Sequence, residues 1–80
     1  MFCVYQHIRL DTNAIFYVGK GSLRRAHSKH RRNKHWNSIV AKAGGFFTQV
    51  VVDGVEEELA FLAEMELIDQ QKRLGARLAN

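Results

Sequence analysis

Proline is absent from this chain of 80 residues, and cysteine occurs only once, at Cys3. A single cysteine excludes an internal disulfide and any four-cysteine zinc site, and it suits a reducing cytoplasm. No apolar run approaches the roughly 18 residues of a membrane span, and Arg9 and Asp11 interrupt any signal-peptide core. We therefore expect a cytoplasmic protein with no membrane partner, whose residues 1–80 form one small domain.

Carboxylates are also scarce outside one region. Seven of the eight Asp and Glu residues fall in residues 53–69, and seven of the twelve Lys and Arg residues fall in residues 20–35. A basic segment joined to an acidic segment indicates a polyanion-binding face and, separately, a place for a cation. Two solvated helix faces would give the same pattern, so charge alone leaves both interpretations open.

Turn residues and apolar periodicity divide the chain into six predicted elements. Ser22 and Asn33 are placed to cap the first two helices, and Gly44 and Gly45 to end the second. The order β-β-α-α-β-α, with a short link between the first two strands, predicts an α+β fold in which helices pack on a three-stranded antiparallel sheet. Strands are predicted over residues 2–10, 14–18 and 46–52, and helices over residues 23–31, 34–43 and 55–74.

The predicted helix over residues 34–43 has one clear amphipathic stripe. Trp36, Ile39, Val40 and Ala43 recur at positions i, i+3, i+4 and i+7. This spacing predicts that Trp36 belongs to the core rather than to an exposed platform for stacking bases.

Glu64 stands beside the apolar side of the last predicted helix. It lies four residues after Ala60 and four before Ile68. A carboxylate at the edge of an apolar face must be paired, hydrogen-bonded or bound to a cation, and Mg²⁺ typically takes only one or two protein carboxylates. The alternative is a surface glutamate on a charged helix. The side predicted to be buried comprises Val55, Leu59, Leu62, Leu67 and Ile68.

The stretch Phe16-Tyr17-Val18-Gly19-Lys20-Gly21 predicts a strand that breaks at two glycines, which hold the Lys20 cation at the strand end. Antiparallel pairing would bring Tyr17 and Tyr5 close enough to point into one site. A nearby ammonium such as that of Lys20, or a metal-bound water, would lower the pKa of a phenol, so that a tyrosine can take a proton from water. Arg25 and a histidine one helical turn further on would grip a phosphate. Together with a metal-binding carboxylate, these are the groups needed for metal-assisted phosphodiester hydrolysis.

These residues resemble the motifs of the GIY-YIG nuclease superfamily. Cys3-Val4-Tyr5 is similar to the first motif, with cysteine in place of its first glycine, and Tyr17-Val18-Gly19 is similar to the second. The helical arginine is matched by Arg25, the metal-binding glutamate before a Leu-Ile pair by Glu64, and the closing asparagine by Asn80. The resemblance spans nearly the whole chain, and residues 31–36 look like those of a phage-type subset.

The resemblance implies a metal-dependent endonuclease that hydrolyses DNA, in a bacterial cell or a phage-infected host. It also implies one Mg²⁺ or Mn²⁺ held by Glu64, a tyrosine that activates water, and Arg and Lys side chains that stabilise the transition state. It leaves open which tyrosine transfers the proton, and we name both, Tyr5 first. The family's usual histidine or tyrosine would fall at Lys29, so the place of a histidine is open, and we name His30. The implied catalytic residues are Tyr5, Tyr17, Lys20, Arg25, His30, Glu64 and Asn80.

The basic segment supplies the predicted DNA contacts, from Arg24, His27, Lys29, Arg31, Arg32 and Lys34. One alternative is a nucleic-acid-binding module of the same fold with weak catalysis, and another is an interaction domain that recruits a partner through its Glu-rich helix. Cleaving both strands of a duplex would need two active sites or a reversal of orientation, so a homodimer is also left open.

Overall fold

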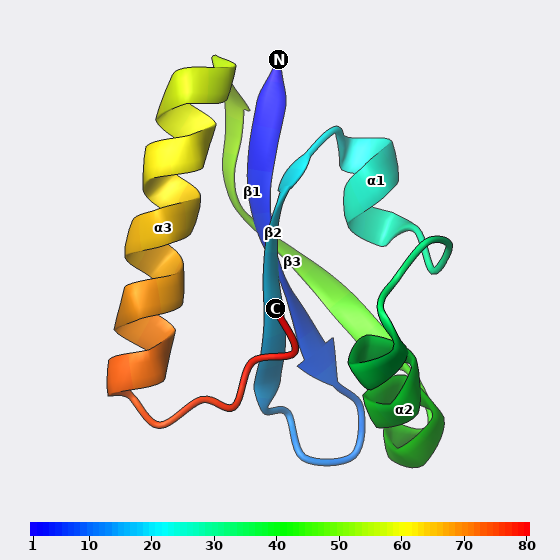
Figure 1. Cartoon of the computed structure of the whole chain (residues 1–80). Coiled ribbons are helices and arrows are strands. Elements are labelled where there is room, and N and C mark those ends of the chain that lie inside the picture. The colour runs from blue at the N-terminus through cyan, green and yellow to red at the C-terminus, as the bar shows by residue number, and fades with distance from the viewer.

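Three antiparallel strands form the sheet of the computed structural model, which describes residues 1–80 (Figure 1). The strand order is β2-β1-β3, with α3 over one face of the sheet and α1 and α2 on the other. The predicted α+β fold and its element order are confirmed. None of the helices is long and apolar enough to cross a membrane. The elements are β1 (Phe2–Arg9), β2 (Ile15–Gly21), α1 (Leu23–His27), α2 (Lys34–Ala43), β3 (Phe46–Val55) and α3 (Glu57–Arg73).

The central strand β1 is buried on both of its faces. All six residues from Cys3 to Ile8 are buried, because helices cover the sheet on both sides and a strand pairs along each edge of β1. Its side chains alternate between the two layers: Val4 packs toward Ala60 of α3, and Tyr5 packs toward Ala26 of α1. Because of this alternation, the side chain of each candidate site residue on the sheet lies on one face or the other.

Strand β2 continues through both glycines to Gly21, so the prediction of a strand that breaks at Gly19 is wrong. Gly19 pairs with Tyr5 of β1, and the Tyr5 ring occupies the space where a side chain of Gly19 would stand. A Cβ atom at Gly19 would lie 2.6 Å from both Cζ and Oη of Tyr5. The glycine therefore serves the close approach of an aromatic ring within a strand and not a turn.

Gly19→Ala is expected to destabilise the protein by about 1–3 kcal/mol, because the added methyl group must displace a buried ring. Without that contact, alanine would stabilise the strand by restricting the unfolded chain. Urea unfolding followed by circular dichroism measures the change. The matched background is Tyr5→Val, in which Gly19→Ala should cost much less, and an equal cost in both backgrounds would contradict the contact.

Helix α1 ends at His27, four residues before the predicted end at Arg31. Ser28 is already extended, and Arg31 has a positive φ of 56°, so the chain forms a loop before α2. The two predicted N-caps are confirmed, because the Ser22 and Asn33 side chains accept hydrogen bonds from backbone N–H groups in α1 and α2. Helix α2 has the predicted bounds, and Gly44 ends it with a φ of 78°.

The predicted packing side of α3 is confirmed at Leu67 and Ile68 and is wrong in the first half of the helix. Leu59 and Leu62, which were expected in the core, are 57% and 56% exposed. Small alanines allow the helix to lie close to the sheet over Val4 and Val18, so the fit of the helix against the strands outweighs the hydrophobicity of the leucines. Strand β3 also extends to Val55, which shortens the helix at its start. The side chains of α3 toward the sheet are those of Ala60, Ala63, Glu64, Leu67 and Ile68.

Candidate active site

The rings of Tyr5 and Tyr17 lie together on the face of the sheet that α1 and α2 cover. Tyr5 pairs with Gly19 and Tyr17 pairs with His7 across the β1–β2 ladder, which directs both phenols to one face. The two ring centroids are 6.5 Å apart, as expected for side chains of one site. Tyr5 is 1% exposed, whereas Tyr17 is half-buried. Tyr17 is therefore the phenol that solvent reaches.

The Tyr5 phenol is held in a buried, charged environment. Burial raises its pKa, and the hydrogen bond of 3.3 Å that Arg32 Nη1 donates to Tyr5 Oη opposes that rise. Because the Tyr5 phenol is buried, it is suited to positioning other groups. Tyr17 is better placed to exchange a proton with water, which reverses the order in which the two tyrosines were named.

His7, which the sequence prediction omitted, lies buried between the tyrosines and α2. Its Nδ1 atom accepts a hydrogen bond of 3.0 Å from Trp36 Nε1, so its Nε2–H donates to the Ala26 carbonyl at 2.7 Å. These two partners require the neutral imidazole in one tautomer. Burial lowers the pKa of His7 to about 4, the Ala26 carbonyl partly offsets this, and the nearby charge of Arg32 lowers it further.

Stability is expected to fall as the pH drops from about 6.5 to about 4. In this range His7 is protonated in the unfolded chain but stays neutral in the folded protein. The contribution of His7 is complete above pH 6.5 and lost below pH 4, and it amounts to about 3 kcal/mol. Urea unfolding at a series of pH values measures it. His7→Gln should remove this part of the pH dependence and the exposed control His35→Gln should retain it; identical slopes in wild type and His7→Gln would contradict the assignment.

Arg32 does not lie on the surface with the other basic residues. It is 8% exposed, and its guanidinium carbon lies 5.3 Å from the Tyr17 ring centroid and 5.8 Å from that of Tyr5. The predicted contact between Arg32 and nucleic acid therefore does not fit its position, because loop residues and aromatic rings enclose the cation.

Arg25 projects from α1 toward the loop that follows this helix. Its guanidinium donates hydrogen bonds to the backbone carbonyls of His30 and Arg31, and its Cβ and Cγ atoms lie 3.4 Å from the Cβ position of Gly21 at the end of β2. Arg25 is half-buried and His30 is exposed. The structure thus places Arg25 at the end of β2, near the tyrosines, and the His30 side chain outside this cluster.

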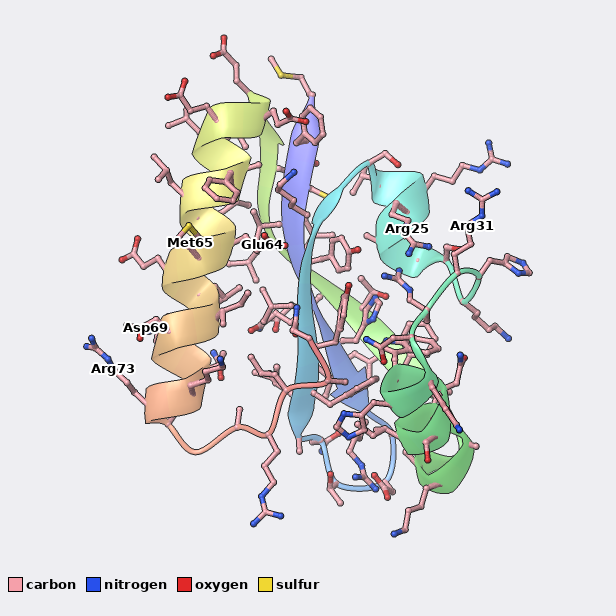
Figure 2. All side chains as sticks on the ribbon, in the orientation of Figure 1. Arg25, Arg31, Glu64, Met65, Asp69 and Arg73 are labelled. Carbon is pink, nitrogen blue, oxygen red and sulfur yellow. The ribbon has the colours of Figure 1, made fainter.

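Lys20 and Glu64 lie on the opposite face of the sheet, toward α3. Lys20 pairs with Val4, which packs against Ala60, and Figure 2 shows Glu64 on the side of α3 that faces the strands. The Lys20 Nζ atom lies 5.5 Å from the Phe2 ring centroid. The sheet separates Lys20 from both phenols, so the predicted action of Lys20 on a tyrosine is wrong.

The Glu64 carboxylate is half-buried and has neither a hydrogen-bond nor an ion-pair partner. Burial raises its pKa, and the charge of Lys20 opposes the rise. A carboxylate in this state fits a site in which Mg²⁺ takes one protein ligand and keeps its waters. No group of three or more His, Cys, Asp and Glu side chains is arranged to hold a metal ion.

Asn80 lies against the outer edge of β2. Its Oδ1 atom accepts a hydrogen bond of 3.0 Å from Val18 N–H, its Nδ2 donates to the Val18 carbonyl, and Ala79 N–H donates to the Phe16 carbonyl at 2.7 Å. The amide of Asn80 thus replaces a neighbouring strand and is occupied by backbone. Asn80 supports the strand that carries Tyr17 and Lys20, and is not a free group at the site.

The remaining basic residues of the segment form an exposed surface beside the aromatic cluster. The two ion pairs of the molecule lie elsewhere, between Arg9 and Asp11 and between Arg73 and Asp69. Figure 2 shows Arg31 at the outer side of the loop after α1, with Arg25 nearer to β2. The exposed Lys and Arg side chains of residues 24–34, together with His27 among them, are here called the basic surface: Arg24, His27, Lys29, Arg31 and Lys34.

The largest cavity, about 570 Å³ in volume, lies at the other end of β2. It is bounded by the β1–β2 turn, α2 and the residues that follow α3, and its lining includes His35, Ile39 and Arg77. None of the predicted catalytic residues lines it. The candidate site therefore lies outside this cavity, and also outside the smaller pocket beside Glu66 on α3.

A signal for His7 was present in the sequence. Cys3, Tyr5 and His7 occupy alternate positions of the first predicted strand, and side chains at alternate positions lie on one face. Arg32 had no such signal, because it lies in a loop where no periodicity indicates which side chains are buried.

Comparison of the chain with protein families, curated proteins and solved structures found no match. Its function is therefore inferred from its own residues and their positions.

Proposed function

We propose that the chain is a metal-dependent endonuclease of the GIY-YIG type that hydrolyses phosphodiester bonds in DNA. The observation that carries the proposal is the unpartnered, half-buried carboxylate of Glu64 facing the strand that holds Tyr17 and Lys20. Such a carboxylate is costly unless a cation binds it. A phenol that solvent reaches lies on the same strand, and the basic surface is nearby.

The outer edge of β2 is the proposed path of the scissile strand. β2 is an edge strand, so a phosphate beside it can contact side chains from both faces of the sheet. Tyr17 and Arg25 approach from one face and Lys20 and Glu64 from the other. Asn80 covers this edge at Val18. A DNA strand would therefore approach the part of the edge that lies beyond Val18, toward Lys20.

Glu64 is the residue that would hold the metal ion. When bound, Mg²⁺ or Mn²⁺ would supply Lewis-acid polarisation of the phosphate oxygens. Tyr17 would take the proton of the attacking water, and Lys20 and Arg25 would stabilise the charge that develops on the phosphate. Arg25 would exchange a carbonyl partner for the phosphate in doing so, because its guanidinium is bound to the carbonyls of the following loop.

The second candidate is a nucleic-acid-binding module with weak catalysis. It is favoured by the same engagement of Arg25 with backbone carbonyls and by the burial of Tyr5, since neither group is free in this arrangement. The basic surface would still bind phosphates in such a protein. Binding without cleavage distinguishes this function from the first.

The test is a cleavage assay on supercoiled plasmid, linear duplex, single-stranded DNA and RNA, with Mg²⁺, with Mn²⁺ and with chelator. A single site per chain is expected to give nicked plasmid before linear product, and chelator should stop the reaction. No cleavage of any substrate by folded protein in either metal would overturn the nuclease proposal. Fluorescence anisotropy with duplex DNA at several salt concentrations then tests the binding module. The four Lys and Arg residues of the basic surface predict a slope of log K against log salt of about −4, and affinity that does not depend on salt would overturn the binding module too.

A further inference from the structure

Arg32 is a buried cation with no acidic partner. Its guanidinium donates to the backbone carbonyls of Ser28, at 3.0 Å, and Arg25, at 2.6 Å, and to the phenol oxygen of Tyr5, at 3.3 Å. Neither ion pair of the molecule involves it. Buried charges are normally paired, because desolvation of a lone ion is unfavourable. A permanent cation kept in the interior without a carboxylate therefore needs another compensation.

Aromatic rings supply part of that compensation. The guanidinium carbon lies 5.3 Å from the ring centroid of Tyr17, 5.6 Å from that of Trp36 and 5.8 Å from that of Tyr5. These distances are within the range of cation–π attraction. Two of the three rings are the phenols of the candidate site, and the fork of Arg32 bonds one of them directly. The cation thus lies where a phenolate would be its natural counter-ion.

No other group around Tyr5 donates a charged hydrogen bond to its phenol. Arg25 acts on Tyr5 only through its charge, Tyr17 would bring a negative charge if ionised, and the Lys20 ammonium lies on the opposite face of the sheet. His7, with its ring centroid 5.1 Å from that of Tyr5, is held neutral by its two hydrogen bonds. The thiol of Cys3 is buried in the same cluster.

We propose that Arg32 is the positioning residue for the two tyrosines: it holds the Tyr5 phenol in place and favours the ionised form of the phenol pair. Its part in cleavage rests on the proposed endonuclease function, in which Tyr17 takes the proton of the attacking water as a phenolate and becomes neutral. The Arg32 guanidinium, 5.3 Å from the Tyr17 ring centroid, stabilises that phenolate before the proton arrives. From the sequence, Lys20 was expected to favour the ionised phenol and Arg32 to bind DNA. In this proposal Arg32 has the role that was expected of Lys20.

The test is a titration of the tyrosines, which are only two in the chain. With ¹³C-labelled tyrosine, NMR follows each phenol separately, and it needs neither DNA nor metal. Arg32→Met removes the charge but retains a long apolar side chain. It is expected to raise the pKa of Tyr5, because both the hydrogen bond and the charge of Arg32 lower it. The matched control is Arg31→Met, the exposed neighbour, which should leave both titrations unchanged and weaken DNA binding instead.

Cleavage by the same variants gives the second readout. Arg32→Met is expected to lower kcat by about 10- to 100-fold with KM little changed, and to move the rate profile toward higher pH. Arg32→Lys keeps the charge and replaces Arg32→Met if that variant does not fold. It should leave the Tyr5 titration near that of wild type. It should still lower kcat, because an ammonium lacks the planar fork of a guanidinium.

Unchanged tyrosine titrations in folded Arg32→Met, or wild-type kcat in Arg32→Lys, would overturn the proposal. If the wild type cleaves nothing while Arg32→Met still shifts the titration of Tyr5, the electrostatic role of Arg32 stands and the nuclease function falls. The two proposals therefore fail by different measurements.

Discussion

Glu64→Gln is expected to slow metal-dependent DNA cleavage by at least about 100-fold, because the variant loses the one carboxylate placed to hold the metal ion. The amide keeps the size of the side chain. Burial already raises the pKa of the Glu64 carboxyl, so a neutral group at this position should not destabilise the fold. The rate of plasmid nicking in Mg²⁺ and in Mn²⁺ measures the effect, and thermal unfolding checks that the variant is folded.

Glu66 offers the matched control for this prediction. It is exposed, two residues further along α3, and belongs to a shallow surface pocket with Asp69 and Arg73. Glu66→Gln should retain the wild-type rate. Mn²⁺ binding, followed by the relaxation of water protons, should be lost in Glu64→Gln and kept in Glu66→Gln. Equal nicking rates and equal Mn²⁺ binding in wild type and Glu64→Gln would remove Glu64 from the site.

Trp36→Ala is expected to have the largest effect on stability. The Trp36 side chain is 1% exposed, its ring centroid lies 4.9 Å from that of Phe46, and its Nε1–H is the donor to His7 Nδ1 at 3.0 Å. Truncating a buried tryptophan costs about 3–5 kcal/mol, and the unpaired acceptor of His7 adds about 1–3 kcal/mol. A domain of this size has a total stability of about 4–12 kcal/mol.

The melting temperature of Trp36→Ala should therefore fall by at least about 15 °C, or the cooperative transition should disappear. Trp36→Phe keeps most of the ring and loses the N–H donor, so its melting temperature should lie between those of wild type and Trp36→Ala. Leu62→Ala, on the exposed side of α3, is the control and should change stability by less than about 1 kcal/mol. A Trp36→Ala protein that melts within a few degrees of wild type would contradict the central packing of this residue.

Local signals predicted the elements well because their causes are local. The capping side chains of Ser22 and Asn33 bond backbone groups within their own first turns, so their identity and spacing suffice to indicate where helices begin. The stripe that contains Trp36 predicted both the bounds of α2 and the burial of that ring. Both inferences needed only neighbouring residues.

Errors arose where a residue's environment comes from distant parts of the chain. Gly19 looked like a turn, yet it lies in a strand because Tyr5, on a different strand, needs the space. Leu59 and Leu62 of α3 looked like part of the packing stripe, yet the smaller Ala60 and Ala63 fit against the sheet. Hydrophobicity indicates which residues favour burial, whereas the shapes of facing elements decide which of them are buried.

Residue types and their local spacing were enough to predict the element order, the helix caps, the burial of Trp36 and the kinds of residue in the candidate site. The arrangement of these residues depends on tertiary contacts, because the pairing register of β1 with β2 places Lys20 on the face of Glu64 and both tyrosines on the other. Tertiary contacts also decide that Arg32, and not Lys20, accompanies the phenols. Faces and burial follow from contacts between residues far apart in the chain, and no local pattern encodes those contacts.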